Sequence, residues 1–301
     1  MSDGEISGNT AASGFGGWVY VLSSGTFTME DGTISGNTAA SGGGVYIMVG
    51  TFNMEGGKIS GNTSQMSGGG VYNWGSFTMK GGEICQNTAS SQGGGVFVDR
   101  GTVKVSGSPV ISGNVKGGTI SEGVLSGGTT NNVFLDSDQF ITVTGQLSNS
   151  TPIGVTMNTP PGKFTNSSTI ANNNIDSFSS DDPLYAVVQY TEDEDIGQLY
   201  LKKIITVSGI TAENKTYDGN TNATLVYTKA VISGKAEGDD LSVTATGTFD
   251  DKNAGPDKTV TITELTLIGT DAYKYTFADS GQQSEATAAI GQKLVLAAIT
   301  V

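Results

Sequence analysis

The sequence of 301 residues contains no histidine, a single cysteine and only 15 lysine and arginine residues. Without histidine the chain cannot form a zinc–histidine site or a serine–histidine–aspartate triad. Cys85 alone cannot form an internal disulfide bond. No apolar run is long enough for a transmembrane helix, and we find no segment with the three- and four-residue apolar spacing of an amphipathic helix. These absences exclude several enzyme classes and predict no membrane insertion.

Basic residues are also outnumbered, because 29 acidic residues give a formal charge of −14. Such a surface repels phosphate backbones and anionic lipids, so we expect no nucleic-acid partner. No signal peptide follows Met1, no wall-sorting or lipid-attachment pattern precedes Val301, and Met1 falls inside a repeat. The acidity and the single cysteine favour an extracellular, cell-surface-associated protein. If the protein is secreted, the sequence is a fragment of a longer multidomain chain, without its signal and anchor and with an uncapped first coil.

One block recurs along the first 115 residues. Its clearest copy joins Ile34-Ser35-Gly36-Asn37-Thr38 to a glycine run and then to Val45-Tyr46-Ile47. Copies begin at Met1, Met29, Met54, Met79 and Val105, so the steps are 28, 25, 25 and 26 residues. Each period holds three short apolar segments separated by Gly, Asn and Ser, as in one coil of a parallel β-helix. The leucine pattern of a leucine-rich repeat and the length of a propeller blade are both missing.

Equivalent positions in successive coils should pair as neighbouring strands about 4.8 Å apart, because no single coil can bury its own apolar face. The predicted core columns are Val19, Val45, Val71 and Val96; Phe27, Phe52 and Phe77; and Ile6, Ile34, Ile59 and Ile84. A polar column in the same register contains Asn9, Asn37, Asn62, Asn87 and Asn114. We expect these amides to hydrogen-bond along the stack, since a metal ladder would need carboxylates beside them.

The block at residues 34–38, followed by Gly42-Gly43-Gly44-Val45-Tyr46, resembles the repeat of right-handed, pectate-lyase-like β-helix surface proteins of gut bacteria. It is also similar to the short repeats of chlamydial polymorphic outer-membrane proteins. The resemblance implies an all-β fold, with a right-handed parallel β-helix of three strands per coil over residues 1–203. It is strong over residues 1–115 and looser over 116–203. The irregular coils expected there include residues 131–135, 141–145, 152–155 and 198–201.

From residue 204 the pattern changes to alternating strands separated by Asp, Gly and Asn turns. Lys215-Thr216-Tyr217-Asp218-Gly219-Asn220-Thr221 resembles the signature of the YDG-type module found in tandem in bacterial adhesins. The family often has Asn before its last tyrosine, where this chain has Lys274 before Tyr275. The resemblance implies a small β-sandwich-like spacer over residues 204–290, with residues 291–301 as a tail or further segment. We expect Tyr217 to anchor the core and Asp218-Gly219 to form a tight turn.

No catalytic or metal site can be assigned from the residues. Glycoside hydrolysis needs two carboxylates that face one another. At one repeat position Glu30 aligns with Glu55 and then with Lys80, so the carboxylates become fewer along the stack and do not gather in one place. The remaining acidic clusters are Asp136 with Asp138, Asp181-Asp182, residues 192–195, Asp239-Asp240 and Asp250-Asp251. We interpret these clusters as solvated charges in turns, and calcium binding by any of them is left as an open alternative. The sequence therefore predicts no enzyme, no cofactor, no catalytic or metal residues, and an unknown ligand-binding site.

Two functional hypotheses remain. The first is an adhesin-like structural or binding fragment, a rigid rod with a spacer, whose partners are host glycans or surface proteins. The alternative is a carbohydrate-active β-helix, a polysaccharide lyase or glycoside hydrolase with catalytic residues lost or outside this fragment. The observation that separates them is whether two or more acids converge with a lysine or arginine in one groove.

Two further expectations concern single columns. Tyr20, Tyr46, Tyr72 and Phe97 should point outward if Val45 and Ile47 point inward, although Asn73 would then face inward too. An outward column of rings would either offer a flat strip to sugars or only stabilise the sheet by stacking. Cys85 replaces the serine of the other coils, and we expect it to be unpaired and replaceable.

Overall fold

The computed structural model describes residues 1–16, 18–166, 174–191 and 195–293. Two compact units are present, residues 1–202 (unit 1) and 203–301 (unit 2). The fold is all-β, as predicted, and unit 1 is a β-solenoid of about six turns. In the ranges given above, no helix is long and apolar enough to cross a bilayer. The short 3-10 helices η1 (Ile175–Ser177) and η3 (Ala272–Lys274) add one turn each.

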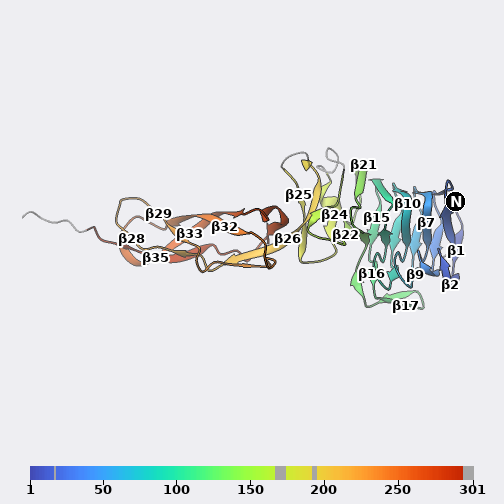
Figure 1. The fold of residues 1–301 in the computed structure, drawn as a ribbon, viewed down its shortest axis with the longest axis horizontal. Helices are drawn as coiled ribbons and strands as arrows, with labels where there is room; N and C mark the ends of the chain where they lie inside the picture. The colour runs from blue at the N-terminus through green and yellow to red at the C-terminus, as the bar shows by residue number, and fades with distance from the viewer. Residues whose placement is uncertain (17, 167–173, 192–194, 294–301) are drawn as a thin grey trace, which may run out of the picture. The chain divides into compact units, whose positions relative to one another are not determined.

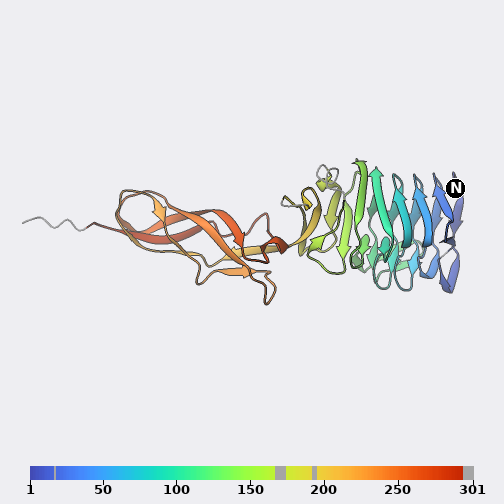
Figure 2. The same ribbon diagram turned by 45° about the horizontal axis from the view of Figure 1, so that its top comes forward.

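Successive coils of unit 1 place their strands side by side in three sheets, as Figures 1 and 2 show from blue to green. Sheet A contains β1 (Glu5–Ser7), β5 (Thr33–Ser35), β8 (Lys58–Ser60), β11 (Glu83–Cys85) and β15 (Val110–Ser112). Sheet B contains β2 (Thr10–Phe15), β6 (Thr38–Ser41), β9 (Thr63–Ser64), β12 (Thr88–Ala89), β16 (Val115–Lys116) and β19 (Thr129–Thr130).

Sheet C is the largest and contains β3 (Val19–Leu22), β4 (Thr26–Met29), β7 (Val45–Met54), β10 (Val71–Met79), β13 (Val96–Val98), β14 (Thr102–Gly107), β20 (Val133–Leu135), β21 (Ile141–Leu147), β22 (Ile153–Met157) and β24 (Phe178–Ser180). In β7 and β10 one strand runs through two apolar segments of its coil, and their pairing shifts register between Trp74 and Ser76. A bulge of this kind lets the strand bend without ending.

The strand registers confirm the three predicted core columns. Val45 pairs with Val19 and Val71, and Phe52 pairs with Phe27 and Phe77. Ile59 pairs with Ile34 and Ile84 in the same way. Val45, Phe52 and Ile59 have no exposed surface at all. Burying such a side chain stabilises a fold by about 1.5–3 kcal/mol, and each coil supplies the cover for its neighbours.

The repeated glycine pairs are required by the spacing between coils. A Cβ atom on Gly43 would collide with the carbonyl oxygen of Gly69 in the next coil, and a Cβ on Gly69 would meet Gly94 in the same way. The backbones approach so closely here that only glycine fits.

The asparagine column forms a continuous ladder of hydrogen bonds. The Asn37 Nδ2 donates to Asn62 Oδ1 at 3.0 Å, and the backbone N of Asn37 donates to the same oxygen at 3.0 Å. The second amide hydrogen of Asn62 goes to the Ile34 carbonyl of the preceding coil. The same pattern links the members of the predicted column and extends it to Asn132. Each buried amide is thereby satisfied, which confirms the structural interpretation of this column.

The ladder has a direction, because in each bond between two asparagines the Nδ2 donates to the Oδ1 of the higher-numbered residue. Its last amide, Asn132, donates from Nδ2 and from its backbone N to the Asp181 carboxylate at 2.7 and 2.6 Å. A row of aligned amides leaves a partial positive charge at its donor end, as at a helix N-terminus, and a carboxylate there is stabilised. Asp181 can reach this position because Gly154 has no Cβ to obstruct it.

The looser half of unit 1 follows the predicted coils only in part. Residues 133–135 and 153–157 extend sheet C in parallel, and β21 pairs in parallel with β14. Residues 198–201, however, do not form a further parallel coil. The strand β26 (Leu199–Ser208) runs antiparallel to β23 (Gly162–Lys163), so unit 1 ends in a different arrangement, with β25 (Tyr185–Gln189) on the other side of β26.

Unit 2 is built from the end of β26 and a five-stranded sheet in the order β28-β35-β33-β32-β29. Its strands are β27 (Thr211–Ala212), β28 (Lys215–Thr216), β29 (Asn222–Ala223), β30 (Leu225–Val226), β31 (Val231–Ser233), β32 (Ser242–Phe249), β33 (Gly255–Ile268), β34 (Tyr275–Phe277) and β35 (Glu285–Gly291). Two small apolar cores hold it together, one around Val207 and Tyr275 and one around Phe249 and Val260.

We expect Asn62→Ala to lower the free energy of unfolding of unit 1 by about 2–4 kcal/mol, because Asn37, Ile34 and Asn87 each lose a buried partner. Tryptophan fluorescence during urea unfolding reports this unit, since Trp18 and Trp74 are the two tryptophans of the chain. Asn9→Ala, at the partly buried end of the ladder, is the control and should cost less than half as much. Equal losses would contradict the ladder's role.

A second prediction concerns the cap of the ladder. Burial raises the pKa of the Asp181 carboxyl, against the opposing hydrogen bonds from Asn132 and Thr156. A carboxyl with a raised pKa stabilises the fold fully below its ordinary pKa, and this contribution is lost as the pH rises through the folded value. The stability advantage of the native chain over Asp181→Asn should therefore shrink as the pH rises above the ordinary carboxyl pKa of about 4. Urea titrations at several pH values measure it, and an advantage that grows with pH would contradict the assignment.

Candidate functional site

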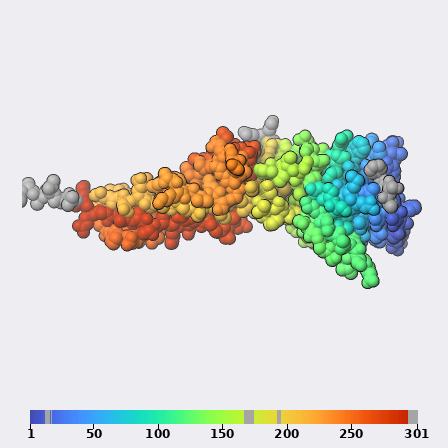
Figure 3. Space-filling model, turned by 60° about the horizontal axis from the view of Figure 1, so that its bottom comes forward, coloured from blue at the N-terminus to red at the C-terminus, as the bar shows by residue number. Residues whose placement is uncertain are grey.

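A β-hairpin interrupts the regular stack after Asn114. It consists of β17 (Thr119–Ser121) and β18 (Val124–Ser126), joined by Glu122 and Gly123. Both turn residues have positive φ, 50° and 76°, as a two-residue hairpin turn requires. Figure 3 shows the hairpin (green) standing out from the surface of the stack. The sequence pattern did not predict this hairpin, because Glu122-Gly123 is not one of the Asn-Gly or Asp-Gly pairs that usually mark such a turn.

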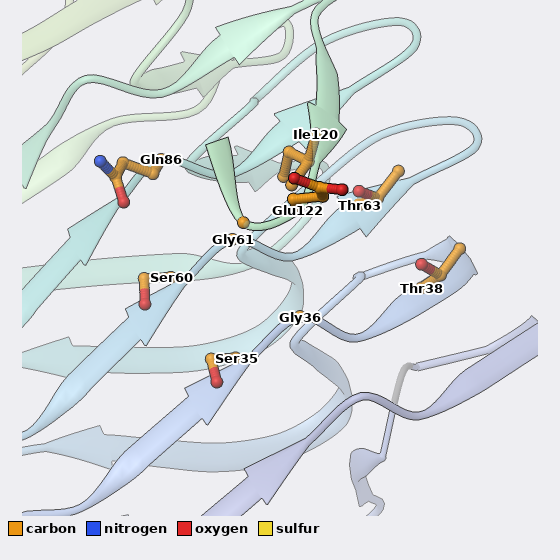
Figure 4. Close-up of a pocket in the computed structure, with 10 residues that line it drawn as sticks. Ser35, Gly36, Thr38, Ser60, Gly61, Thr63, Gln86, Ile120 and Glu122 are labelled. Atoms are coloured by element: carbon orange, nitrogen blue, oxygen red, sulfur yellow. The ribbon is translucent and has the colours of Figure 1, made fainter. Parts of the chain in front are cut away.

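The hairpin covers one side of a polar groove of about 400 Å³ on the coil surface. Figure 4 shows a serine column and a threonine column on the two sides of the coil turn, with Glu122 reaching over it. The lining residues are Ser35, Gly36, Thr38, Ser60, Gly61, Thr63, Gln86, Ile120, Glu122 and Gly123. Hydroxyl groups, one amide and one carboxylate thus face the groove. None of these lining residues is basic, so the groove suits a ligand rich in hydroxyl groups more than an anion.

The aromatic column is present and lies opposite the core. Val45 and Ile47 belong to the core cluster, so Tyr46 points the other way, as predicted. Asn73 is buried inside, where its Nδ2 donates to the Thr102 carbonyl at 3.0 Å. The ring centroids of Tyr46 and Tyr72 are 4.7 Å apart with planes only 5° from parallel.

The stack also extends from Tyr20 at one end to Phe134 at the other. The rings cover one another's faces, so a sugar placed against the column would contact mainly ring edges. Tyr46 is only 5% exposed. Burial raises the pKa of its hydroxyl. Stacking of the rings therefore stabilises the sheet, and the buried Tyr46 does not offer an open aromatic face, whereas Tyr72 and Phe97 are half-buried.

A second groove, of about 280 Å³, brings acids and a lysine together. Asp136, Asp138 and Lys163 line it, along with Phe140 and Asn158. Asn158 Nδ2 donates to Asp136 Oδ1 at 2.8 Å, and Lys163 Nζ donates to Asp195 Oδ1 at 2.6 Å. That hydrogen bond from Lys163 lowers the pKa of Asp195. The groove contains the residue types of a carbohydrate-active site, but its lysine is already paired.

The acidic clusters of unit 2 are paired with lysines, and the Asp181-Asp182 cluster of unit 1 accepts hydrogen bonds from neutral groups. In unit 2, Lys258 pairs with Asp250 and Asp251, and Lys274 pairs with Asp239 and Asp271. The ion pairs lower the pKa of Asp251 and Asp271. In unit 1, Asp181 caps the ladder and Asp182 Oδ1 accepts from the Leu184 backbone. Residues 192–194 lie outside the described ranges. Within those ranges no group of three or more His, Cys, Asp or Glu side chains could hold a metal ion.

The signature segment of unit 2 departs from expectation at its tyrosine. Tyr217 is 37% exposed and belongs to neither apolar core, so its prediction as a core anchor is wrong. The buried tyrosine is Tyr275, whose hydroxyl accepts from the Ala236 backbone and donates to Asp239. Asp218 and Gly219 do form a tight turn, in which Gly219 has a φ of 84° and the Asn220 backbone donates to Asp218 Oδ1.

Comparison with known families identifies the domain type of unit 2. Residues 201–284 match the family described as the YDG domain. The chain thus contains a YDG domain. No curated protein matches the sequence, and no solved structure matches it either. In the YDG domain Lys274, which precedes the buried Tyr275, pairs with Asp239 and Asp271.

Cys85 is free and only 6% exposed, between Ser60 and Ser112 in sheet A. Burial raises the pKa of its thiol to about 11, and the nearby Glu83 carboxylate adds to this. We expect alkylation of the folded chain at pH 8 to be much slower than that of the urea-unfolded chain, which serves as the control. Cys85→Ser should cost no more than about 1 kcal/mol in urea unfolding, because serine occupies this position in neighbouring coils. A larger loss would show that the thiol packs in a way serine cannot replace.

Proposed function

We propose that this chain is an extracellular, cell-surface-associated, adhesin-like protein, in which unit 1 is a rigid, non-catalytic rod that binds glycans weakly. The YDG domain serves as its spacer. Stacked coils with a buried amide ladder support the role of a rod, because every coil is held by its neighbours. The negative charge of −14 and the single cysteine suit a soluble surface outside the cell.

The observation that carries the binding role is the hairpin β17–β18. It adds little to the core, since Val124 is 66% exposed and only Ile120 and Leu125 are half-buried. A two-stranded hairpin alone is marginally stable, and insertions into repeat proteins often mark the binding face. The hairpin does, however, enclose the hydroxyl-lined groove with Glu122 at its tip. Hydroxyl and carboxylate groups recognise the hydroxyls of a neutral or amino-substituted glycan.

A glycan array followed by titration tests this proposal. We expect Glu122→Ala and Ser60→Ala/Thr63→Val to weaken binding of the best glycan about tenfold, which corresponds to about 1.4 kcal/mol. Thr102→Val, an exposed position in sheet C outside the groove, is the matched control and should leave affinity unchanged. Tyr46→Ala/Tyr72→Ala should lower the urea midpoint more than the affinity. Binding that ignores the groove variants, or captures only proteins, would overturn the glycan proposal.

The groove at Asp136, Asp138 and Lys163 favours a second candidate, a carbohydrate-active β-helix. Its test is incubation with neutral and acidic polysaccharides, followed by assay of new reducing ends and of unsaturated products. Activity that disappears in Asp136→Asn/Asp138→Asn would establish the enzyme and contradict the non-catalytic rod. No product from either class of polysaccharide would support the rod.

A further inference from the structure

The turn after β28 in the YDG domain encloses the ammonium group of Lys215 in oxygen atoms. Its Nζ lies 2.9 Å from Asp218 Oδ1, 2.9 Å from Asn220 Oδ1, 2.9 Å from the Asn220 carbonyl and 3.0 Å from the Asn222 carbonyl. An ammonium group has three hydrogens to donate, so four oxygens surround it more fully than an ordinary ion pair requires. The Lys215 side chain is only 18% exposed.

The spacing of these residues is similar to the start of a calcium loop. Asp218, Asn220 and Asn222 alternate along the chain like the first three ligands of such loops, but Asn222 presents its backbone carbonyl to Lys215 Nζ and not its side chain. Asp218 Oδ1 accepts from the Asn220 backbone and Asn220 Oδ1 from the Asn222 backbone, so both side chains are held with their oxygens towards the centre. One carboxylate, one amide oxygen and two carbonyls are hard oxygen ligands of the kind that calcium takes.

A second feature marks the centre of this turn as a cation position. The ring of Phe249, from β32, lies 5.4 Å from Lys215 Nζ, so an aromatic face adds to the oxygens around the positive charge. Phe249 is buried in the smaller core of the unit. The centre is therefore occupied by a cation in the structure, and that cation belongs to the chain.

We propose that residues 218–222 form a cation loop in which the Lys215 ammonium takes the place of a calcium ion. The lysine makes the loop independent of metal, and its removal leaves a site for a divalent cation. In the native chain the hydrogen bond from Lys215 lowers the pKa of Asp218, which keeps this carboxylate charged beside the ammonium group. Calcium fits because it tolerates irregular oxygen geometry, whereas magnesium demands an octahedron and keeps its water.

The test is Lys215→Met in the full chain, which keeps an apolar stem on Phe249 and removes the charge. By calorimetric titration we expect the variant to bind one calcium ion with a dissociation constant of about 10⁻⁴–10⁻³ M, the range of extracellular calcium modules. The native chain should bind at this loop at least tenfold more weakly. Magnesium should not substitute, and calcium should raise the melting temperature of the variant but not that of the native chain.

Two matched controls locate the effect. Lys215→Met/Asp218→Asn should lose the calcium response, because the only carboxylate of the loop is gone. Lys58→Met removes an ammonium paired with a single carboxylate, Glu83 at 2.8 Å, and should gain no calcium binding. A Lys215→Met chain that binds calcium no better than the native chain would overturn the proposal, and so would an equal gain in Lys58→Met.

A measurement on the native sequence covers the case in which Lys215→Met fails to fold. Reductive methylation followed by mass spectrometry should modify Lys215 at least tenfold more slowly than the exposed Lys252, since its nitrogen is enclosed. Asp218→Asn should restore the rate at Lys215 alone. Equal rates at Lys215 and Lys252 in the native chain would show that the loop does not hold the ammonium, and the proposal would fall.

Discussion

Stacking of equivalent residues at the distance between two neighbouring strands is the constraint on which unit 1 depends. At this separation each side chain contacts the equivalent side chain of the next coil, so the residue type at each repeat position forms a column along the stack. Apolar residues at one position form a core column, and aromatic residues form a stack of rings. A buried asparagine becomes a ladder that satisfies every amide, although a single buried amide without partners would be costly. Glycine is fixed where two backbones approach most closely.

Stacking also limits which surfaces of unit 1 are free to bind a ligand. Side chains that face the inside or stack on the outside are engaged by neighbouring coils, as the rings of Tyr46 and Tyr72 show. Room for a ligand arises where the repeat is broken, at the hairpin β17–β18 and in the irregular coils around Asp136. The ladder also has a direction, because the aligned amides end on the carboxyl oxygens of Asp181, which accept hydrogen bonds at its donor end.

The YDG domain is stabilised in a different way from the stacked coils of unit 1. It has two small cores and long antiparallel strands in place of repeated coils. Its acidic turns gather around Lys215, Lys258 and Lys274, so each turn carries its own counter-charge. Exposed ion pairs add little stability singly. The enclosed Lys215 is different, because four oxygens of one turn accept hydrogen bonds from its ammonium group.

The sequence by itself determined the coil period, the core columns and the asparagine register, since a repeat of constant length allows one alignment of Ile34 with Ile59 and Asn37 with Asn62. It also indicated the YDG domain from the residues around Asp218. It could not place Asp181 at the end of the ladder, 49 residues from Asn132, because no periodicity relates the two. Nor could it show that Tyr217 is exposed while Tyr275 is buried. Those outcomes depend on which irregular segments meet in space, and only the tertiary structure decides that.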